Sequence, residues 1–203
     1  MPSDTKPEID WDSLTFSFTQ TDRMYMAKCE IGGEWEKGAM KDYEDLVISP
    51  AAGVLNYGQG LFEGLKAQRA SDGSIVLFRP QQNARRAQEG ARRLGMPPVP
   101  EEMFLDAVIS AVRENSRWVP PMGKGALYIR PLLMGSGPIL GVAPAPEYTF
   151  LVFTSPVGPY FKGGITPTSL RVSDKFHRAA PGGSGGVKAI GNYAPGMIPS
   201  KMA

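Results

Sequence analysis

The 203-residue chain has little cysteine and little histidine, with one residue of each, Cys29 and His177. A single cysteine excludes an intramolecular disulfide and a zinc site built from several cysteines. The single histidine has no second histidine, cysteine cluster or pair of carboxylates beside it, which argues against a metal site. No nucleophile-elbow sequence accompanies it for Ser–His–Asp chemistry. We therefore interpret His177 as a surface or loop residue.

The chain also has little net charge and no long hydrophobic run. Lys+Arg 22 against Asp+Glu 20 gives +2, which is too small for a nucleic-acid-binding surface. No apolar run reaches the roughly 18 residues of a transmembrane helix, so we expect no membrane partner. The first residues lack a secretory or organelle-targeting pattern. These absences predict a cytoplasmic protein and leave open a plastid or mitochondrial form whose N-terminal part is missing.

The residues that are present indicate a loop-rich α+β protein. Hydrophobic residues make up 42% and charged residues 21%, which is typical of globular chains, while Gly 24 and Pro 19 are many for a helical bundle. Apolar residues spaced by three and four predict a helix over 101–115, and composition predicts another over 81–94. A turn at 71–73 predicts a hairpin between its two flanking strands. We expect strands at 24–31, 65–69, 74–78, 126–134, 147–155 and 170–173, and a short helix early in 51–64.

Two groups of charged residues are candidates for anion binding. The helix over 81–94 carries two arginine pairs seven residues apart, Arg85–Arg86 and Arg92–Arg93, so members of each pair recur on the same face. They form either a solvated basic face or a site in which one arginine points inward and binds a phosphate through two hydrogen bonds. Tyr128 and Arg130 are two apart on a strand and therefore share a face, which suits a carboxylate ligand or simple packing.

Lys188 lies in a glycine-rich segment with no acidic residue from Phe176 to Ala203. A phosphate-binding P-loop needs glycine directly before the lysine and serine or threonine after it, and Val187 and Ala189 occupy those positions. Desolvation without an acidic partner favours the neutral amine, which can condense with an aldehyde cofactor. Most lysines are solvated instead, and that interpretation also stands.

Five segments, in order and spacing, resemble the branched-chain amino-acid aminotransferases, which are fold-type IV pyridoxal-phosphate enzymes, and the plant members above all. The resemblance extends from about Trp11 to about Pro199. The segments are NYGQGLFEGLKA (56–67), LFRPQQNARR (77–86), LYIRPLLMGSGP (127–138), PVGPYFKGG (156–164) and GGVKAIGNYAP (185–195).

The resemblance implies a two-domain α+β architecture and a role for individual residues. Lys188 would form the Schiff base with pyridoxal 5'-phosphate, Tyr193 would hydrogen-bond the phenolic oxygen of the cofactor, and Arg86 would bind its phosphate. Tyr128 and Arg130 would line the substrate side. The aromatic residues Tyr57 and Phe62 would line the pocket. The implied domains are a leader (1–13), a nearly complete small N-terminal domain (14–155), an interdomain linker (156–164) and the start of a large, mostly missing cofactor-binding domain (165–203).

The expected activity is transamination of leucine, isoleucine and valine with 2-oxoglutarate, in the biosynthesis or catabolism of branched-chain amino acids, by a homodimer in the full-length family. Family members continue well beyond the lysine, so we expect this chain to be truncated at its C-terminus. Two alternatives stay open. One is a weakly active or inactive chain that associates with full-length subunits. The other is a different fold-type IV activity, either D-amino-acid transamination or aminodeoxychorismate cleavage.

Overall fold

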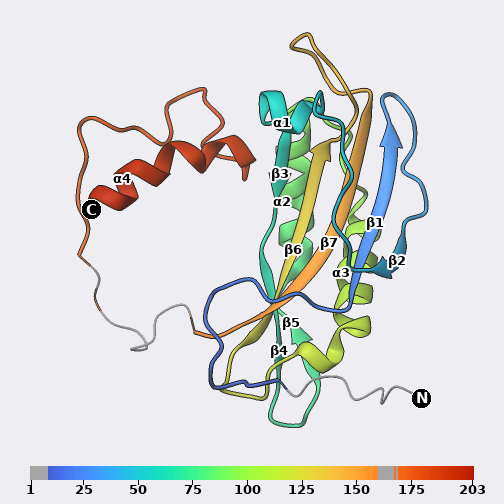
Figure 1. The fold of residues 1–203 in the computed structure, drawn as a ribbon, viewed down its shortest axis with the longest axis vertical. Coiled ribbons are helices and arrows are strands. Elements are labelled where there is room, and N and C mark those ends of the chain that lie inside the picture. The colour runs from blue at the N-terminus through green and yellow to red at the C-terminus, as the bar shows by residue number, and fades with distance from the viewer. Residues whose placement is uncertain (1–8, 160–166, 168) are drawn as a thin grey trace.

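The computed structural model describes residues 9–159, 167 and 169–203. Its centre is a seven-stranded antiparallel sheet with the order β2-β1-β7-β6-β4-β5, in which β3 also pairs with β6 (Figure 1). β6 is long enough to pair along its length with β7 and at its two ends with β3 and β4. The strands are β1 (Arg23–Glu30), β2 (Ala39–Asp42), β3 (Gly60–Phe62), β4 (Leu65–Arg69), β5 (Ile75–Leu77), β6 (Ala126–Gly135) and β7 (Glu147–Val157).

Two helices cover one face of this sheet and bury the main core. Helix α3 contacts β1, β6 and β7, and α2 packs against α3 and β3. The ring of Phe104 on α3 stacks on Phe150 of β7 with 5.8 Å between centroids. The described helices are α1 (Gly53–Tyr57), α2 (Pro80–Arg93), α3 (Glu101–Glu114) and α4 (Met197–Met202), with 3₁₀ turns at Ser116–Trp118, Ile190–Asn192 and Ala194–Gly196.

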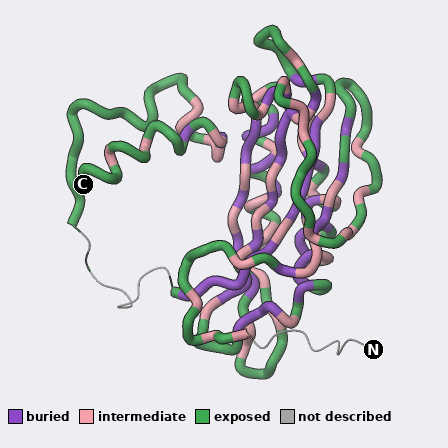
Figure 2. Tube along the Cα trace, in the orientation of Figure 1, coloured by how far each residue is buried: buried purple, intermediate pink, exposed green. Residues whose placement is uncertain are grey.

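The two faces of β6 differ as the alternation of its side chains requires. Leu127 and Ile129 are fully buried in the core under the helices. Tyr128 and Arg130 therefore project from the opposite face. Most of the segment after residue 168 runs away from the sheet and is exposed (Figures 1 and 2). The stretch near β3 is the part that contacts the sheet and is partly buried.

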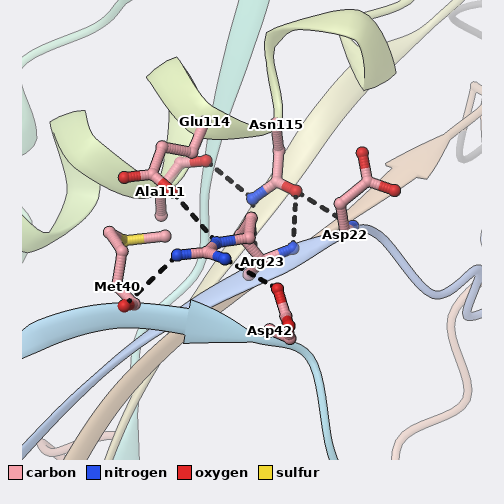
Figure 3. A network of polar contacts seen from close by, with 7 residues as sticks. All are labelled: Asp22, Arg23, Met40, Asp42, Ala111, Glu114 and Asn115. Atoms are coloured by element: carbon pink, nitrogen blue, oxygen red, sulfur yellow. Dashed lines mark hydrogen bonds and ion pairs between the residues drawn. The ribbon is translucent and has the colours of Figure 1, made fainter.

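Asn115 attaches the end of α3 to the start of β1 (Figure 3). Its side-chain oxygen accepts hydrogen bonds from the backbone N–H groups of Asp22 and Arg23 at 3.1 and 3.0 Å. Its amide nitrogen donates to the carbonyls of Arg23 and Ala111 at 2.9 and 2.8 Å. The side chain is fully buried, and all four of its hydrogen-bonding positions are used. Helix α3 is thus fixed against the sheet by polar contacts as well as by packing.

Most predicted elements are confirmed, including the hairpin, in which β4 pairs with β5, and the helices α2 and α3. The strand predicted at 170–173 is wrong. That segment is irregular, and Leu170 and Val172 are more than nine-tenths exposed, because no described strand lies beside it to accept its backbone hydrogen bonds. β2, β3 and α4 were not predicted. β7 continues two residues into the predicted linker 156–164, and residues 160–164 lie outside the described part.

Candidate active site

The segment that carries Lys188 is held against the edge strand β3. The backbone N–H of Phe62 donates to the carbonyl of Lys188 at 3.1 Å, and Leu61 forms an isolated antiparallel bridge with Ala189. The Lys188 segment therefore adds to β3 as a short strand would, and this places the lysine side chain beside the ring of Phe62.

The Lys188 amine lies in a small aromatic cage. Its Nζ donates to the Tyr193 hydroxyl at 3.1 Å and lies 4.5 Å from the centroid of the Phe62 ring. The rings of Phe62 and Tyr193 are themselves in contact, with 4.8 Å between centroids. A cationic amine is attracted to the faces of such rings, and a neutral amine can exchange a proton with the phenol.

Asn192 fixes the turn on which Lys188 is mounted. Its Nδ2 donates to the carbonyls of Ser184 and Val187 at 2.7 and 2.9 Å, and its Oδ1 accepts from the Ser184 hydroxyl at 2.7 Å. The residue is 9% exposed. These three hydrogen bonds join the turn after Lys188 to the glycine-rich loop just before it.

Arg130 and Tyr128 enter the same cluster from β6. Arg130 Nη2 donates to the Tyr128 hydroxyl at 3.1 Å, and its guanidinium carbon lies 4.4 Å from the Phe62 centroid. The Tyr128 hydroxyl occupies the space that a side chain at position 64 would fill, which explains glycine there. Within the described residues, the buried Nε of Arg130 has no hydrogen-bond partner. A buried unpaired donor points to a ligand or water at this place.

Tyr128 and Arg130 also line a cavity of about 450 Å³. This volume lies within the range of small-molecule sites, about 300–1,000 Å³. Its other walls are mainly aromatic: Phe16, Ser17, Phe18, Tyr43, Phe153, Ser155 and Val157. A larger hollow of about 900 Å³ lies at the polar network of Figure 3, where Arg23 is engaged by Asp42 and Glu114. The smaller cavity is the one that shares residues with the cluster around the lysine.

Arg86 on α2 is bound by a buried carboxylate, Glu63. Arg86 Nε donates to Glu63 Oε1 at 2.7 Å and Nη2 donates to Oε2 at 2.6 Å, while Asn83 Nδ2 donates to Oε2 at 2.8 Å. The Glu63 hydrogen bonds are the main cause that raises the pKa of Arg86, with smaller contributions from the charges of Glu63 and Tyr193. The pairing places Arg86 against the residue that directly follows Phe62, and the Arg86 side chain is 47% exposed.

Five of the seven predicted site residues are in contact with one another: Lys188, Tyr193, Phe62, Tyr128 and Arg130. Arg86 joins them through Glu63, the residue after Phe62. Tyr57 lies apart at the end of α1, where its hydroxyl donates to the carbonyl of Leu140. Sequence reasoning missed Glu63, Asn83 and Asn192. The one available signal was Glu63 itself, a single acid within the apolar stretch GLFEGL.

The other features singled out in the sequence have structural explanations. Arg85 pairs with Glu101 at 3.3 Å on the exposed side of α2, and Arg93 donates to the carbonyl of Gly182 at 3.0 Å. His177 is exposed in a loop, as predicted. Across residues 9–159, 167 and 169–203, no cluster of three or more metal-ligating side chains occurs. No helix in this part of the chain is both long and apolar enough to cross a bilayer.

Comparison with curated proteins gives strong similarity to plant aminotransferases, although no family model matches the chain. Branched-chain-amino-acid aminotransferase 5, chloroplastic, of Arabidopsis thaliana is 60% identical over 187 residues, which is 92% of this chain and 45% of that protein. Branched-chain amino acid aminotransferase 1, mitochondrial, of Humulus lupulus is 55% identical over 95% of this chain and 49% of its own length. A methionine aminotransferase of Arabidopsis thaliana is 51% identical over 94% of this chain and 54% of its length.

Solved structures show the same fold at lower identity. The branched-chain aminotransferase of Thermoproteus uzoniensis with norvaline has a TM-score of 0.69 and 22% identity, covering 90% of this chain and 56% of that one. A second branched-chain amino acid aminotransferase, solved with pyridoxamine 5'-phosphate, has a TM-score of 0.64 and 21% identity, over 91% of this chain and 56% of that one. The chain is thus a homologue of the plant branched-chain aminotransferases with the mixed α+β fold of that enzyme class, and it spans about half the length of the curated relatives it matches.

Proposed function

We propose that this chain carries the lysine, the phosphate-binding arginine and the substrate wall of a pyridoxal-phosphate-dependent branched-chain aminotransferase. The observation that carries the proposal is the position of the Lys188 amine, 3.1 Å from the Tyr193 hydroxyl and directly over Phe62. An amine held beside a phenol is suited to covalent attachment to an aldehyde and to proton transfer. Arg130, which lines the cavity, packs on the same Phe62 ring as this amine.

The side chains of the cluster fit the chemical groups of pyridoxal 5'-phosphate. The Lys188 amine matches an aldehyde, the Tyr193 hydroxyl matches the phenolic oxygen, and the exposed part of the Arg86 guanidinium matches a phosphate dianion. The unpaired Nε of Arg130 indicates that a further acceptor belongs on the substrate side. When bound, the cofactor supplies an electron sink for charge that develops at the substrate α-carbon.

The residues of this chain would then perform three tasks. The Lys188 amine would take and return the proton at the substrate α-carbon, and Tyr193 would hold that amine in place. Arg130 binds a carboxylate. The aromatic walls exclude water and suit leucine, isoleucine and valine as amino donors, with 2-oxoglutarate as acceptor. Such walls separate substrates that differ by a methylene by only about 1–3 kcal/mol, so related apolar amino acids are expected to react as well.

A second candidate function is association with longer aminotransferase subunits as a weakly active or inactive chain. It is favoured by exposed apolar side chains on two segments, among them Leu140, Val142, Leu170 and Val172, which are 87–95% exposed. Exposed apolar surface of this kind is typical of an interaction site. Co-elution with a longer homologue, together with no turnover of leucine by the isolated chain, would favour this candidate.

The proposed function is tested by titrating the purified chain with pyridoxal phosphate and recording the absorbance of the lysine-bound cofactor. We expect a stoichiometric band that is lost in Lys188→Ala and retained in Lys175→Ala, since Lys175 is an exposed lysine of the same segment. Added leucine should discharge the band, and glycine should do so less. An equal band in Lys188→Ala would contradict the proposal.

A further inference from the structure

Glu63 has no role in the proposed reaction, yet its burial requires an explanation. Its side chain is 1% exposed, and glutamates are almost never so buried without a partner. It follows β3 directly and precedes Gly64, and its backbone N–H donates to the carbonyl of Pro131 at 2.8 Å. The carboxylate is therefore fixed from two sides, by the sheet through its backbone and by Asn83 through its side chain.

The contact between Glu63 and Arg86 uses one edge of the guanidinium. Nε and one N–H of Nη2 are bound by the two carboxylate oxygens, so among the described residues two of the five N–H donors of Arg86 are used. The remaining three, on Nη1 and the far side of Nη2, face away from Glu63. A planar group held along one edge has a fixed plane and a fixed direction for its other edge.

We propose that Glu63 is a positioning residue that aims the free edge of Arg86 at the phosphate group of pyridoxal phosphate. The inference rests on the proposed function. Two effects of Glu63 oppose each other: its negative charge, adjacent to Arg86, weakens the attraction of any anion, whereas its geometry keeps the arginine in one orientation. Orientation is the larger effect in this arrangement because the carboxylate is rigid and the arginine on its own would be a flexible side chain on the exposed face of α2.

Charge and orientation change anion binding in opposite directions, so the substitution Glu63→Gln tests the proposal. The glutamine amide can accept only one of the two Arg86 hydrogen bonds and presents its own N–H₂ to the other. Loss of charge alone would tighten anion binding. Loss of orientation would weaken it, by about 10-fold, the lower end of what removal of an orienting partner costs at metal sites.

The experiment measures equilibrium dissociation constants of the 203-residue chain for pyridoxal phosphate and for pyridoxal, which has the aldehyde and no phosphate. We expect Glu63→Gln to weaken the binding of pyridoxal phosphate about 10-fold, which is the loss expected when an orienting partner is removed. The binding of pyridoxal should not change. The matched control is Glu101→Gln on α3, which removes the ion-pair partner of Arg85, the neighbour of Arg86 on α2, and should change neither constant. Asn83→Ala should give a smaller loss in the same direction, and it carries the test if Glu63→Gln does not fold.

Unchanged or tighter binding of pyridoxal phosphate to Glu63→Gln, or an equal loss for both compounds, would overturn the proposal. The same two outcomes would overturn it with Asn83→Ala. A wild-type chain that binds neither compound at Lys188 would overturn the proposed function and this inference with it. That result is distinguishable, because it is seen before any substitution at position 63.

Discussion

Asn192→Ala is predicted to loosen the turn that carries Lys188. The substitution removes the three hydrogen bonds by which Asn192 joins Ser184 and Val187. Each is worth roughly 0.5–1.5 kcal/mol in a protein. Since Ser184 and Val187 are only half-buried, hydrogen bonds to water replace part of the lost energy. The local stability of the turn should therefore fall by about 2 kcal/mol. The population of the opened turn should therefore rise about 30-fold.

Hydrogen–deuterium exchange measures this opening directly. The N–H groups of Val187 and Asn192 are hydrogen-bonded to the carbonyls of Ser184 and Ala189 in the folded turn, and their exchange should accelerate about 30-fold, in line with the loss of local stability. Exchange in β6 and β7 should not change. The pyridoxal-phosphate band on Lys188 should weaken in parallel.

The control for Asn192→Ala is Asn56→Ala, which removes the two side-chain hydrogen bonds of Asn56 to the carbonyls of Pro50 and Ala52 in a different loop. It should leave exchange over 184–193 as in the wild type. If Asn192→Ala also leaves that exchange unchanged, Asn192 does not hold the turn and the reasoning is refuted.

Three further predictions concern the sheet domain. Asn115→Ala should lower the free energy of unfolding by about 3 kcal/mol because it removes four hydrogen bonds made by a fully buried side chain. A urea midpoint unchanged at equal slope would contradict this. Burial raises the pKa of the Cys29 thiol, so the contribution of the protonated thiol to stability is present at pH below its pKa in the unfolded chain and is lost as the pH rises through its pKa in the folded chain. Iodoacetamide should therefore modify Cys29 more slowly in the folded chain than in urea. Equal rates of modification would disprove this prediction. The Ser74 hydroxyl and backbone N–H hold the pKa of Asp72 below its usual range, so the turn that contains Asp72 is stabilised at pH above the pKa of the unfolded chain and loosened as the pH falls through the pKa of the folded chain. An NMR titration of Asp72 should show a low midpoint that rises in Ser74→Ala. Identical midpoints in the two proteins would be evidence against this prediction.

The parts of the fold that follow from local patterns could be predicted from the sequence. Phe104, Ala107, Val108, Ala111 and Val112 are the apolar positions that predicted α3, and all five are buried. Alternation predicts that Leu127 and Ile129 face the core, which is confirmed. These predictions succeed because helix and strand periodicity alone determine which side chains share a face.

The parts that depend on distant partners could not be predicted. β3 is only three residues long and exists because β6 extends far enough to pair with it, at Leu61↔Leu133 among others. The stretch at 170–173 has strand-forming residues and no described strand beside it. Short segments of this kind take their structure from neighbours that are remote in the sequence.

The candidate site shows the same division. The shared face of Tyr128 and Arg130 follows from their spacing of two, and their hydrogen bond confirms the prediction. Arg86 is one of four arginines on the same helix, and its protein partner is the carboxylate of Glu63, 23 residues earlier. This pairing joins the loop after β3 to helix α2, and the spacing of the two residues in the sequence does not predict it.

We propose that the amine of Lys188 is the group that attaches pyridoxal phosphate. This proposal is tested most directly by treating the chain with pyridoxal phosphate and borohydride, and then mapping the modified peptides by mass spectrometry. We expect a single dominant modification at Lys188, with Lys175 and Lys201 unmodified when the cofactor is stoichiometric. Modification spread evenly over these three lysines would contradict it.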